Sequence, residues 1–537
     1  MSKKEKNLNN DNFFEKIYIA ISYVFLGFFS FYINYWTGSR GVFPVDTFVH
    51  FDSGIRILQG ELPLRDFWVV HGVVVDFIQS LFFLIFGENW KAYIFHSSFL
   101  NLIITIFSYR IFKKEFKIEN KYALILSICL SILFFPVSGT PFLDIHSAFF
   151  STISLYLIFF FIKYQKNFYL FLSIFSLGLA FFSKQVPAAY FIILITIFLI
   201  FYSFSIKKIN PILISFLSLC SFLLLVYIFL VYNKIDLNIF LVQIFLFPQE
   251  ISVDRFSSYK MNLKNIFLDF KFIYLFLIPC LLITLREYFN KNMLKKDLNY
   301  SIILTFFSVS LIYHQIHTKN QIFIFFLIPI LCAFLFYMLN NYKTKHNNYL
   351  IQFFMLACIL ITFKYHDRFN LDRKFHELSN TNISKGKPVS FKKEFFSGLK
   401  WITPKFQNPG EEIKIIQNFY EIIKKDKSNK ILITHYNFFS GLTSTKLYSP
   451  SRTYDKIAYP GISSKYFENY KIFFKSNIIR NKVKNIYVFE PGTNITEKDL
   501  NHKVFNYLPA ECYGVIDIAP YLKKIGIQDC SYLKIRK

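Results

Sequence analysis

The stretch FPVDTFVHFDSGIRILQGELPLRDFWVVHG, residues 43–72, separates two hydrophobic segments and is too polar to cross a bilayer. Residues 52–58 predict a short helix, which Gly60 ends and Pro63 prevents from resuming. A loop beside a membrane surface with so many ionisable groups is a candidate functional site, and an ordinary solvated loop is the alternative. Its ionisable side chains are Asp46, His50, Asp52, Arg56, Glu61, Arg65, Asp66 and His71.

The composition is that of a membrane protein. Hydrophobic residues make up 54% of the chain, with 72 phenylalanines, and the mean hydropathy is +0.36. These residues lie in blocks between 17 and 364 and become sparse afterwards. The fold class that we predict is an α-helical polytopic membrane protein with a C-terminal α/β domain. The membrane region is residues 1–364, and residues 365–537 are long enough to form a domain with its own core.

The apolar blocks predict eleven membrane spans. Residues 73–86 are also apolar, but they are too short to cross and predict a helix that lies at the membrane interface. No small-residue cleavage site follows the first span, which we interpret as an uncleaved anchor. The predicted spans are residues 17–36, 91–112, 121–137, 147–162, 168–183, 186–206, 211–232, 271–288, 300–316, 321–340 and 348–364.

Loop charge predicts the orientation. Lysine and arginine concentrate in alternate short loops, which include the N-terminal SKKEK and RIFKKEFKIENK. The positive-inside rule places these loops in the cytoplasm, and the acidic first loop and residues 365–537 on the extracytoplasmic side of the cell (inner) membrane. The net charge of +27 is explained by topology and by contact with anionic membrane lipids, so we do not expect nucleic acid as a partner.

The C-terminal region shows its own pattern. Residues 430–435 and 485–490 predict two buried strands, and residues 411–425 predict an amphipathic helix before the first strand. Cys512 and Cys530 are a candidate disulfide if this region faces an oxidising compartment. Neither strand is followed by a glycine loop that would cradle a phosphate.

The first loop resembles a known family. The loop contains Asp46, then a spacer, the pattern I-L-x-G-x-x-P-x-R-D-F, and H-G. This order resembles the first external loop of the GT-C glycosyltransferases. That class includes protein O-mannosyltransferases and the aminoarabinose transferases of lipid A. Many relatives have glutamate where this chain has Thr47, and tyrosine where it has Leu64. They also often have Tyr-Gly-Pro where this chain has His71-Gly72-Val73.

The resemblance implies that a sugar moves from a polyprenyl-phosphate donor to a lipid, glycan or protein acceptor. Such a transfer needs a general base for the acceptor hydroxyl and positive charge for the leaving phosphate. Asp46 is the candidate base, with an exposed loop carboxylate or a helix cap as the alternative. Asp144, in SGTPFLDIHSAF, matches the second acidic position of the family, with a helix cap as the alternative. Asp52 is placed as a helix cap.

Two cations are candidates for the donor phosphate. Arg65 has the basic position of the R-D-F run, and its alternative is a salt bridge with Asp66 or Glu61. Lys184, in GLAFFSKQVPA, resembles the G-x-x-x-x-(T/S)-K element of the class, and a lysine that reaches the membrane interface is the alternative. The remaining candidates for substrate binding are His50, Arg56, Asp66, His71, His314 and His317.

No cofactor and no metal ligand is assigned. The sequence contains no C-x-x-C or H-E-x-x-H signature. His314 and His317, together with His50 and His71, are the residues that would bind a divalent metal or the donor phosphate. Their spacing is weak evidence, and hydrogen bonding within the loops is the alternative.

Other functions remain open at this point. A transporter or flippase for lipid-linked glycans predicts ionisable residues in the middle of the spans and an inverted repeat. Here the charges collect in the loops, and no repeat is evident. A polymerase or ligase of surface polysaccharide shares the donor chemistry but not the first-loop motif. A non-enzymatic scaffold is the remaining alternative.

Overall fold

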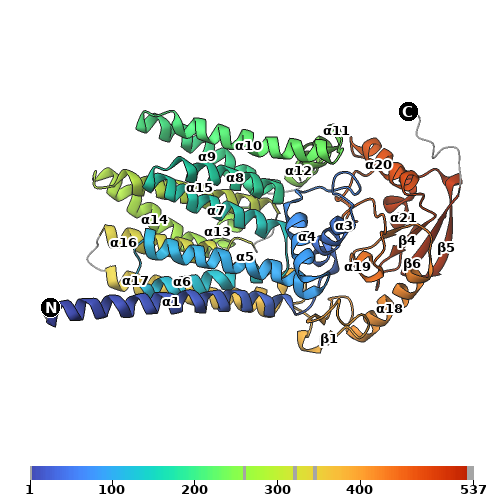
Figure 1. The fold of residues 1–537 in the computed structure, drawn as a ribbon, viewed down its shortest axis with the longest axis horizontal. Coiled ribbons are helices and arrows are strands. Elements are labelled where there is room, and N and C mark those ends of the chain that lie inside the picture. Colours follow the sequence, from blue (N-terminus) through green and yellow to red (C-terminus); the bar gives the residue numbers. More distant parts are fainter. Residues whose placement is uncertain (1–2, 258–261, 319–322, 343–346, 529–537) are drawn as a thin grey trace.

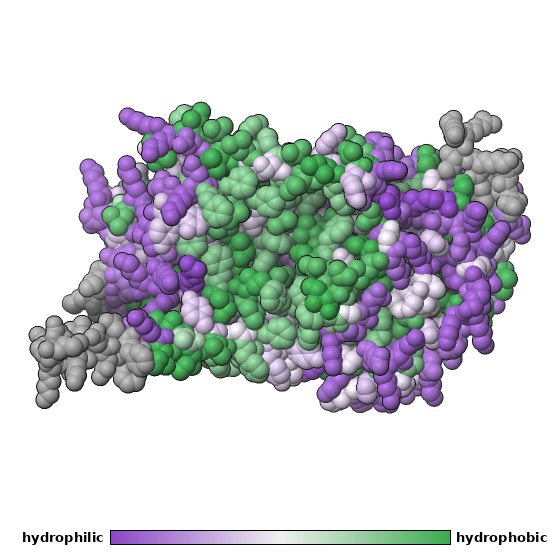
Figure 2. Space-filling view, in the orientation of Figure 1, coloured by the Kyte–Doolittle hydropathy of each residue, from purple (hydrophilic) through white to green (hydrophobic). Residues whose placement is uncertain are grey.

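The computed structural model describes residues 3–257, 262–318, 323–342 and 347–528. Long helices lie side by side, and a smaller region built from the C-terminal residues covers one end of them (Figure 1). The N-terminus is at the opposite end. The surface carries a hydrophobic band between two polar ends, which is the pattern of a protein that spans a bilayer (Figure 2).

Each predicted span corresponds to a helix. Within the described residues, eight helical stretches are long and apolar enough to cross a membrane. Helices α8 and α16 are apolar but shorter, and α15 is not among the eight, so the count of eleven crossings stays a prediction. The helices are α1 (Lys3–Gly38), α5 (Trp90–Arg110), α6 (Asn120–Leu133), α7 (Leu143–Tyr164), α8 (Asn167–Ser183), α9 (Gln185–Ile206), α10 (Asn210–Tyr232), α14 (Lys271–Phe289), α15 (Lys295–Thr318), α16 (Leu327–Asn341) and α17 (Asn347–Tyr365).

The first loop folds into short helices. Helix α2 (Pro44–Thr47) leads directly into α3 (Val49–Leu58), which begins three residues before the predicted helix and ends before Gly60. Gly60 has a φ of +84°, a conformation that favours glycine. Helix α4 (Val74–Phe86) is the predicted short apolar helix, and Gly87, with a φ of +83°, ends it. Between α10 and α14 lie three further short helices, α11 (Leu237–Leu241), α12 (Phe247–Ser257) and α13 (Leu263–Leu268).

The C-terminal region contains a four-stranded sheet in the order β3-β4-β6-β5. The two predicted strands are β3 (Lys430–Ile433) and β4 (Asn485–Phe489), and they are parallel. The antiparallel strands β5 (Tyr513–Ala519) and β6 (Leu522–Ile527) complete the sheet. The helices are α18 (Pro409–Lys425), which is the predicted one, α19 (Phe439–Thr443), α20 (Phe467–Arg480) and α21 (Glu497–Lys503). A two-stranded pair, β1 (Lys387–Pro388) with β2 (Lys400–Trp401), lies before them.

The first loop packs with the C-terminal region in two hydrophobic clusters. The Phe48 ring stacks on Trp401 with ring centroids 5.7 Å apart, and Phe51 meets Phe395 at 5.3 Å. Farther along the loop, Trp68 packs against Tyr470 of α20. The loop is thus enclosed between the membrane helices and the C-terminal region. Cys512 is disulfide-bonded, and Cys530 lies outside the described residues.

Candidate active site

A cavity of about 1000 Å³ lies where the membrane helices meet the C-terminal region. Its wall is formed by α2 and α3, the first turn of α7, the junction of α8 and α9, the end of α15 and residues 452–458. Seven of the residues proposed from the sequence line it: Asp46, His50, His71, Asp144, Lys184, His314 and His317. The fold therefore brings together side chains from loops that are far apart in the sequence.

Asp46 is a half-buried carboxylate on the short helix α2. Among the residues that the structure describes, none is hydrogen-bonded or ion-paired to this carboxylate. Burial raises the pKa of Asp46, and the nearby carboxylates of Asp455, Asp144 and Glu377 raise it further, while Lys184 opposes them; the result is a pKa of about 7. A carboxylate with a pKa near neutrality is suited to take a proton from a substrate.

Asp144 is fixed by two partners. As the second residue of α7, it accepts hydrogen bonds on both carboxylate oxygens from the Lys184 amine, each at 2.7 Å. His314 Nε2, at the end of α15, lies 3.1 Å from one of these oxygens. Asp144 is 4% exposed, so the ion pair is buried. Lys184 therefore does not extend to the membrane interface, and Asp144 is more than a helix cap.

A second buried chain of charges runs behind the cavity. His50 Nδ1 is 2.6 Å from a carboxylate oxygen of Asp76, in the first turn of α4. The Arg452 guanidinium donates to the other oxygen at 2.8 Å, and to the Gly72 carbonyl at 3.4 Å. All three side chains are almost fully buried, and His50 and Arg452 also face the cavity. Through these contacts, Arg452 of the C-terminal region is linked to His50 and Gly72 of the first loop.

His71 is held as a neutral ring. Its Nδ1 lies 3.3 Å from Gln185 Oε1, and the Gln185 amide donates to the carbonyls of Val70 and Ile244. Burial lowers the pKa of His71 to about 3, assisted by the positive charges of Lys184 and Arg452. At neutral pH this ring therefore offers hydrogen bonds to a ligand without adding charge.

Asp455 contributes a carboxylate from the C-terminal region. It lines the cavity, and His435 Nε2 lies 3.3 Å from it. Burial lowers the pKa of His435, but Glu490, 3.0 Å away on the other side of the ring, and Asp455 outweigh this effect and raise it to about 9. His435 is thus an imidazolium that holds Asp455 in place.

Three of the proposed residues lie outside the cavity. Arg65 binds its neighbour Asp66 through Nη2 at 2.7 Å and Nε at 3.0 Å, and Arg480 also pairs with Asp66. Arg56 binds Glu61 at 2.7 Å. The salt-bridge alternative for Arg65 is therefore the arrangement that the structure shows. The cations that face the cavity are Lys184, Arg452 and Lys374.

The sequence did not single out Asp76, Arg452 and Asp455 as site residues. Asp76 is a charged side chain in an otherwise apolar stretch, and that contrast was a usable signal. Arg452 and Asp455 lie in an irregular segment with no motif around them, so only the fold reveals them.

The histidines do not form a metal site. Within the described ranges, no group of three or more histidine, cysteine, aspartate or glutamate side chains is placed to hold a metal ion. His314 instead contacts Asp144, His50 contacts Asp76, and the His317 ring packs against Tyr313 with centroids 4.4 Å apart. We therefore derive no step through a metal.

Part of the chain is similar to a known family. Residues 70–228 match the model of the dolichyl-phosphate-mannose-protein mannosyltransferase family, a segment that includes Asp144 and Lys184 but neither Asp46 nor the C-terminal region. No curated protein matches the chain significantly.

Two solved structures share a similar arrangement at low sequence identity. Both are of the Archaeoglobus fulgidus oligosaccharyltransferase. The complex with zinc and sulfate has 11% identity and a TM-score of 0.44, with 94% of this chain and 73% of that chain covered. The apo form has 12% identity and a TM-score of 0.44, with 88% and 70% covered. Over residues 70–228, the family match agrees with the first-loop resemblance and with the helical membrane architecture, so this segment is similar to a membrane glycosyltransferase.

Proposed function

We propose that the protein transfers a sugar from a polyprenyl-phosphate donor to the hydroxyl of a lipid, glycan or protein acceptor, on the extracytoplasmic face of the membrane. The observation that carries this proposal is the meeting of Asp46 and Asp144 in one cavity at the membrane boundary. The cavity wall combines these carboxylates and three cations with aromatic side chains such as Tyr190, Phe245 and Tyr313. That mixture suits a donor with a polar phosphate-sugar head and an apolar chain.

In this proposal Asp46 accepts the proton of the acceptor hydroxyl, while the hydroxyl oxygen forms a bond to the anomeric carbon of the sugar. The bond between that carbon and the phosphate oxygen breaks, and the electron pair leaves with the phosphate. Lys184 and Arg452 supply positive charge for the phosphate. Asp144 holds Lys184 in position, His314 contacts Asp144, and the neutral His71 ring provides a further hydrogen bond.

The test has two stages. Mass spectrometry of surface glycolipids and glycoproteins, from cells with and without the protein, should reveal a missing sugar and thereby its acceptor. Purified protein is then supplied with a polyprenyl-phosphate sugar and that acceptor. Loss of a positioned base costs about 10²–10⁴-fold in rate, so Asp46→Asn should accumulate normally and transfer almost no sugar. Unchanged turnover by Asp46→Asn removes Asp46 as the base, and identical glycans in the two cell types remove the proposed activity.

A further inference from the structure

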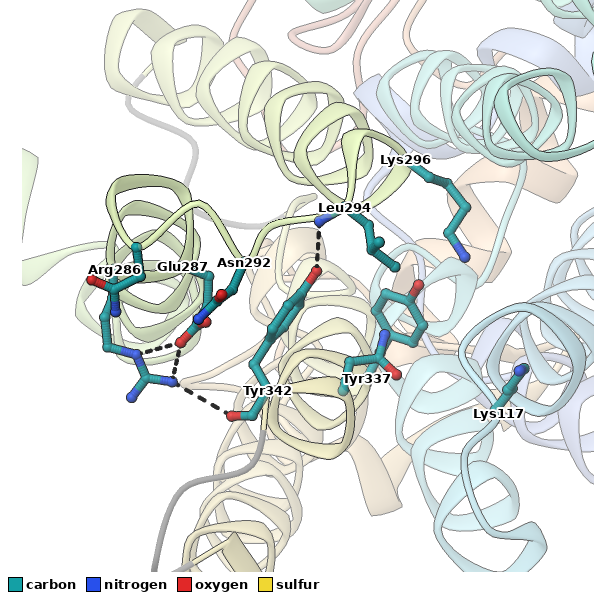
Figure 3. Close-up of a pocket in the computed structure, with 10 residues that line it drawn as sticks. Lys117, Arg286, Glu287, Asn292, Leu294, Lys296, Tyr337 and Tyr342 are labelled. Atoms are coloured by element: carbon teal, nitrogen blue, oxygen red, sulfur yellow. Dashed lines mark hydrogen bonds and ion pairs between the residues drawn. The ribbon is translucent and has the colours of Figure 1, made fainter.

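A second pocket, of about 840 Å³, lies at the end of the helices that is opposite the C-terminal region. It is framed by the turn between α5 and α6, the connection from α14 to α15, and the end of α16 (Figure 3). None of its residues lines the cavity described above. Its lining is polar and basic: Lys117, Arg286, Glu287, Asn290, Asn292, Leu294, Lys296, Tyr337, Asn341 and Tyr342.

The acidic groups at this pocket are already satisfied. Glu287 accepts from Arg286 Nε at 2.6 Å, and a second nitrogen of the same guanidinium lies 2.5 Å from the same oxygen. Asp297, fully buried beneath the pocket, accepts hydrogen bonds from the Tyr337 hydroxyl at 2.5 Å and from the Tyr342 hydroxyl at 2.8 Å. Both carboxylates are therefore engaged by protein groups.

Two lysines bring positive charge to the pocket. Lys296 Nζ forms a long ion pair with Asp297 at 3.7 Å, without a hydrogen bond, and lies over the rings of Tyr300 and Tyr337. Lys117 makes no ion pair within the described part of the chain. Both amines stand on one side of Tyr337 in Figure 3, while the Arg286–Glu287 pair lies across the pocket. The side-chain amides of Asn290, Asn292 and Asn341 add further donors at the pocket wall.

The surroundings match a lipid. The pocket lies at the end of the helices opposite the C-terminal region, and Figure 2 shows polar side chains beyond the hydrophobic band at that end. Beside it, the last turns of α14 expose Leu285 and Phe289, which are 50% and 75% accessible. A phosphate held by the lysines would leave its acyl chains along these apolar side chains. Under the predicted orientation this end faces the cytoplasmic leaflet, which is rich in anionic lipids.

We propose that this pocket binds the phosphate headgroup of an anionic phospholipid through Lys117 and Lys296. The proposal does not depend on the proposed glycosyl transfer, because the two sites lie at opposite ends of the molecule. A soluble phosphate compound offers the same anionic chemistry without the acyl chains, and the experiment separates the two sources.

The test is native mass spectrometry of the full chain in detergent, with phosphatidylglycerol, phosphatidylcholine of the same acyl chains, or glycerol phosphate added. We expect bound phosphatidylglycerol on the wild type, and about a 25-fold weaker apparent affinity for Lys117→Gln/Lys296→Gln, because each basic side chain near an anionic headgroup contributes about fivefold. The matched control is Lys207→Gln/Lys208→Gln, which removes two exposed lysines from the loop between α9 and α10 without touching the pocket. That control should bind as the wild type does.

A second variant distinguishes loss of lipid binding from loss of folding. Asn292→Asp keeps the shape of the side chain and places a carboxylate in the pocket, so it should also weaken binding while the melting temperature stays unchanged. Equal affinity of the pocket and control variants overturns the proposal, and so does an equal response to phosphatidylcholine. Binding of glycerol phosphate that is as tight as that of the lipid overturns the lipid as the source.

Discussion

The Lys184 amine lies 2.7 Å from both carboxylate oxygens of Asp144, across the gap between the start of α7 and the junction of α8 and α9. Together with His314, this contact occupies Asp144. Asp46, in the same cavity, has no such partner among the described residues. The two carboxylates of the family pattern thus stand in different environments, which favours Asp46 for proton transfer and Asp144 for positioning.

The rate of sugar transfer should follow the ionisation of Asp46. A base must be unprotonated, and the pKa of Asp46 is about 7. We expect the initial rate at saturating donor to rise between about pH 6 and 8 and to level off above, whereas Asp46→Asn should be slow and nearly independent of pH over this range. Initial rates at a series of pH values measure this. A rise of the same shape in Asp46→Asn would assign the ionisation to another group.

The same ionisation should affect stability. The pKa of Asp46 is higher in the folded protein than its ordinary value of 3.8, so the folded state binds this proton more tightly. The stabilising contribution is complete below about pH 4 and is lost as the pH rises through about 7. Asp46→Asn should therefore melt higher than the wild type at pH 8, by a margin that shrinks toward pH 5. Melting curves of both proteins at each pH test this, and a margin that does not vary with pH would contradict it.

The buried Asp144–Lys184 pair predicts coupled mutational effects. Removal of one partner of a buried ion pair leaves the other charge uncompensated and costs roughly 3–5 kcal/mol. Asp144→Asn and Lys184→Gln should each lower the melting temperature, and the double variant should melt higher than the less stable single variant. Additive losses in the double variant would show that the pair is not energetically coupled.

Arg452 and Arg65 should respond differently to loss of the guanidinium. Arg452→Lys keeps the charge but cannot bridge Asp76, Gly72 and a phosphate, so we expect at least about a tenfold loss in donor use. Arg65→Lys is the matched control, because Arg65 pairs with Asp66 outside the cavity. It should retain nearly full activity. The reverse ranking, with both variants folded, would return the donor role to Arg65.

Topology can be tested directly. The C-terminal region and the first loop lie at one end of the molecule, and the N-terminus lies at the other. Loop charge predicts that the N-terminal end is cytoplasmic. A reporter that is active only in the cytoplasm should be silent when it is fused after Lys537, and active when it is fused at the N-terminus. A bright C-terminal fusion would reverse this orientation.

The elements that the sequence predicted are those with a continuous apolar signal. The membrane helices and α4 stand out because their apolar blocks are long and bounded by charge or glycine. The short helices α11–α13 and the β5–β6 pair did not, because their residues are mixed and partly exposed. For such segments the tertiary contacts decide the structure more than local preference does.

Prediction of the candidate site divides in the same way. Asp46, Asp144 and Lys184 belong to local patterns that resemble a family, so their presence in one cavity was foreseeable. The Asp76–Arg452 contact joins residues that are 376 positions apart. No local pattern encodes such a pairing. Arg65 shows the opposite case: it belongs to a recognisable motif, but the motif does not determine where its side chain points.

The packing between the first loop and the C-terminal region has a consequence for protein engineering. Chimeras that exchange only residues 365–537 between related enzymes would separate Phe48 from Trp401, and Asp76 from Arg452. Such hybrids would lose the cavity wall together with whatever selectivity was being transplanted. A functional exchange must move residues 43–86 together with the C-terminal region. These two parts of the chain are distant in sequence but must be exchanged as one unit.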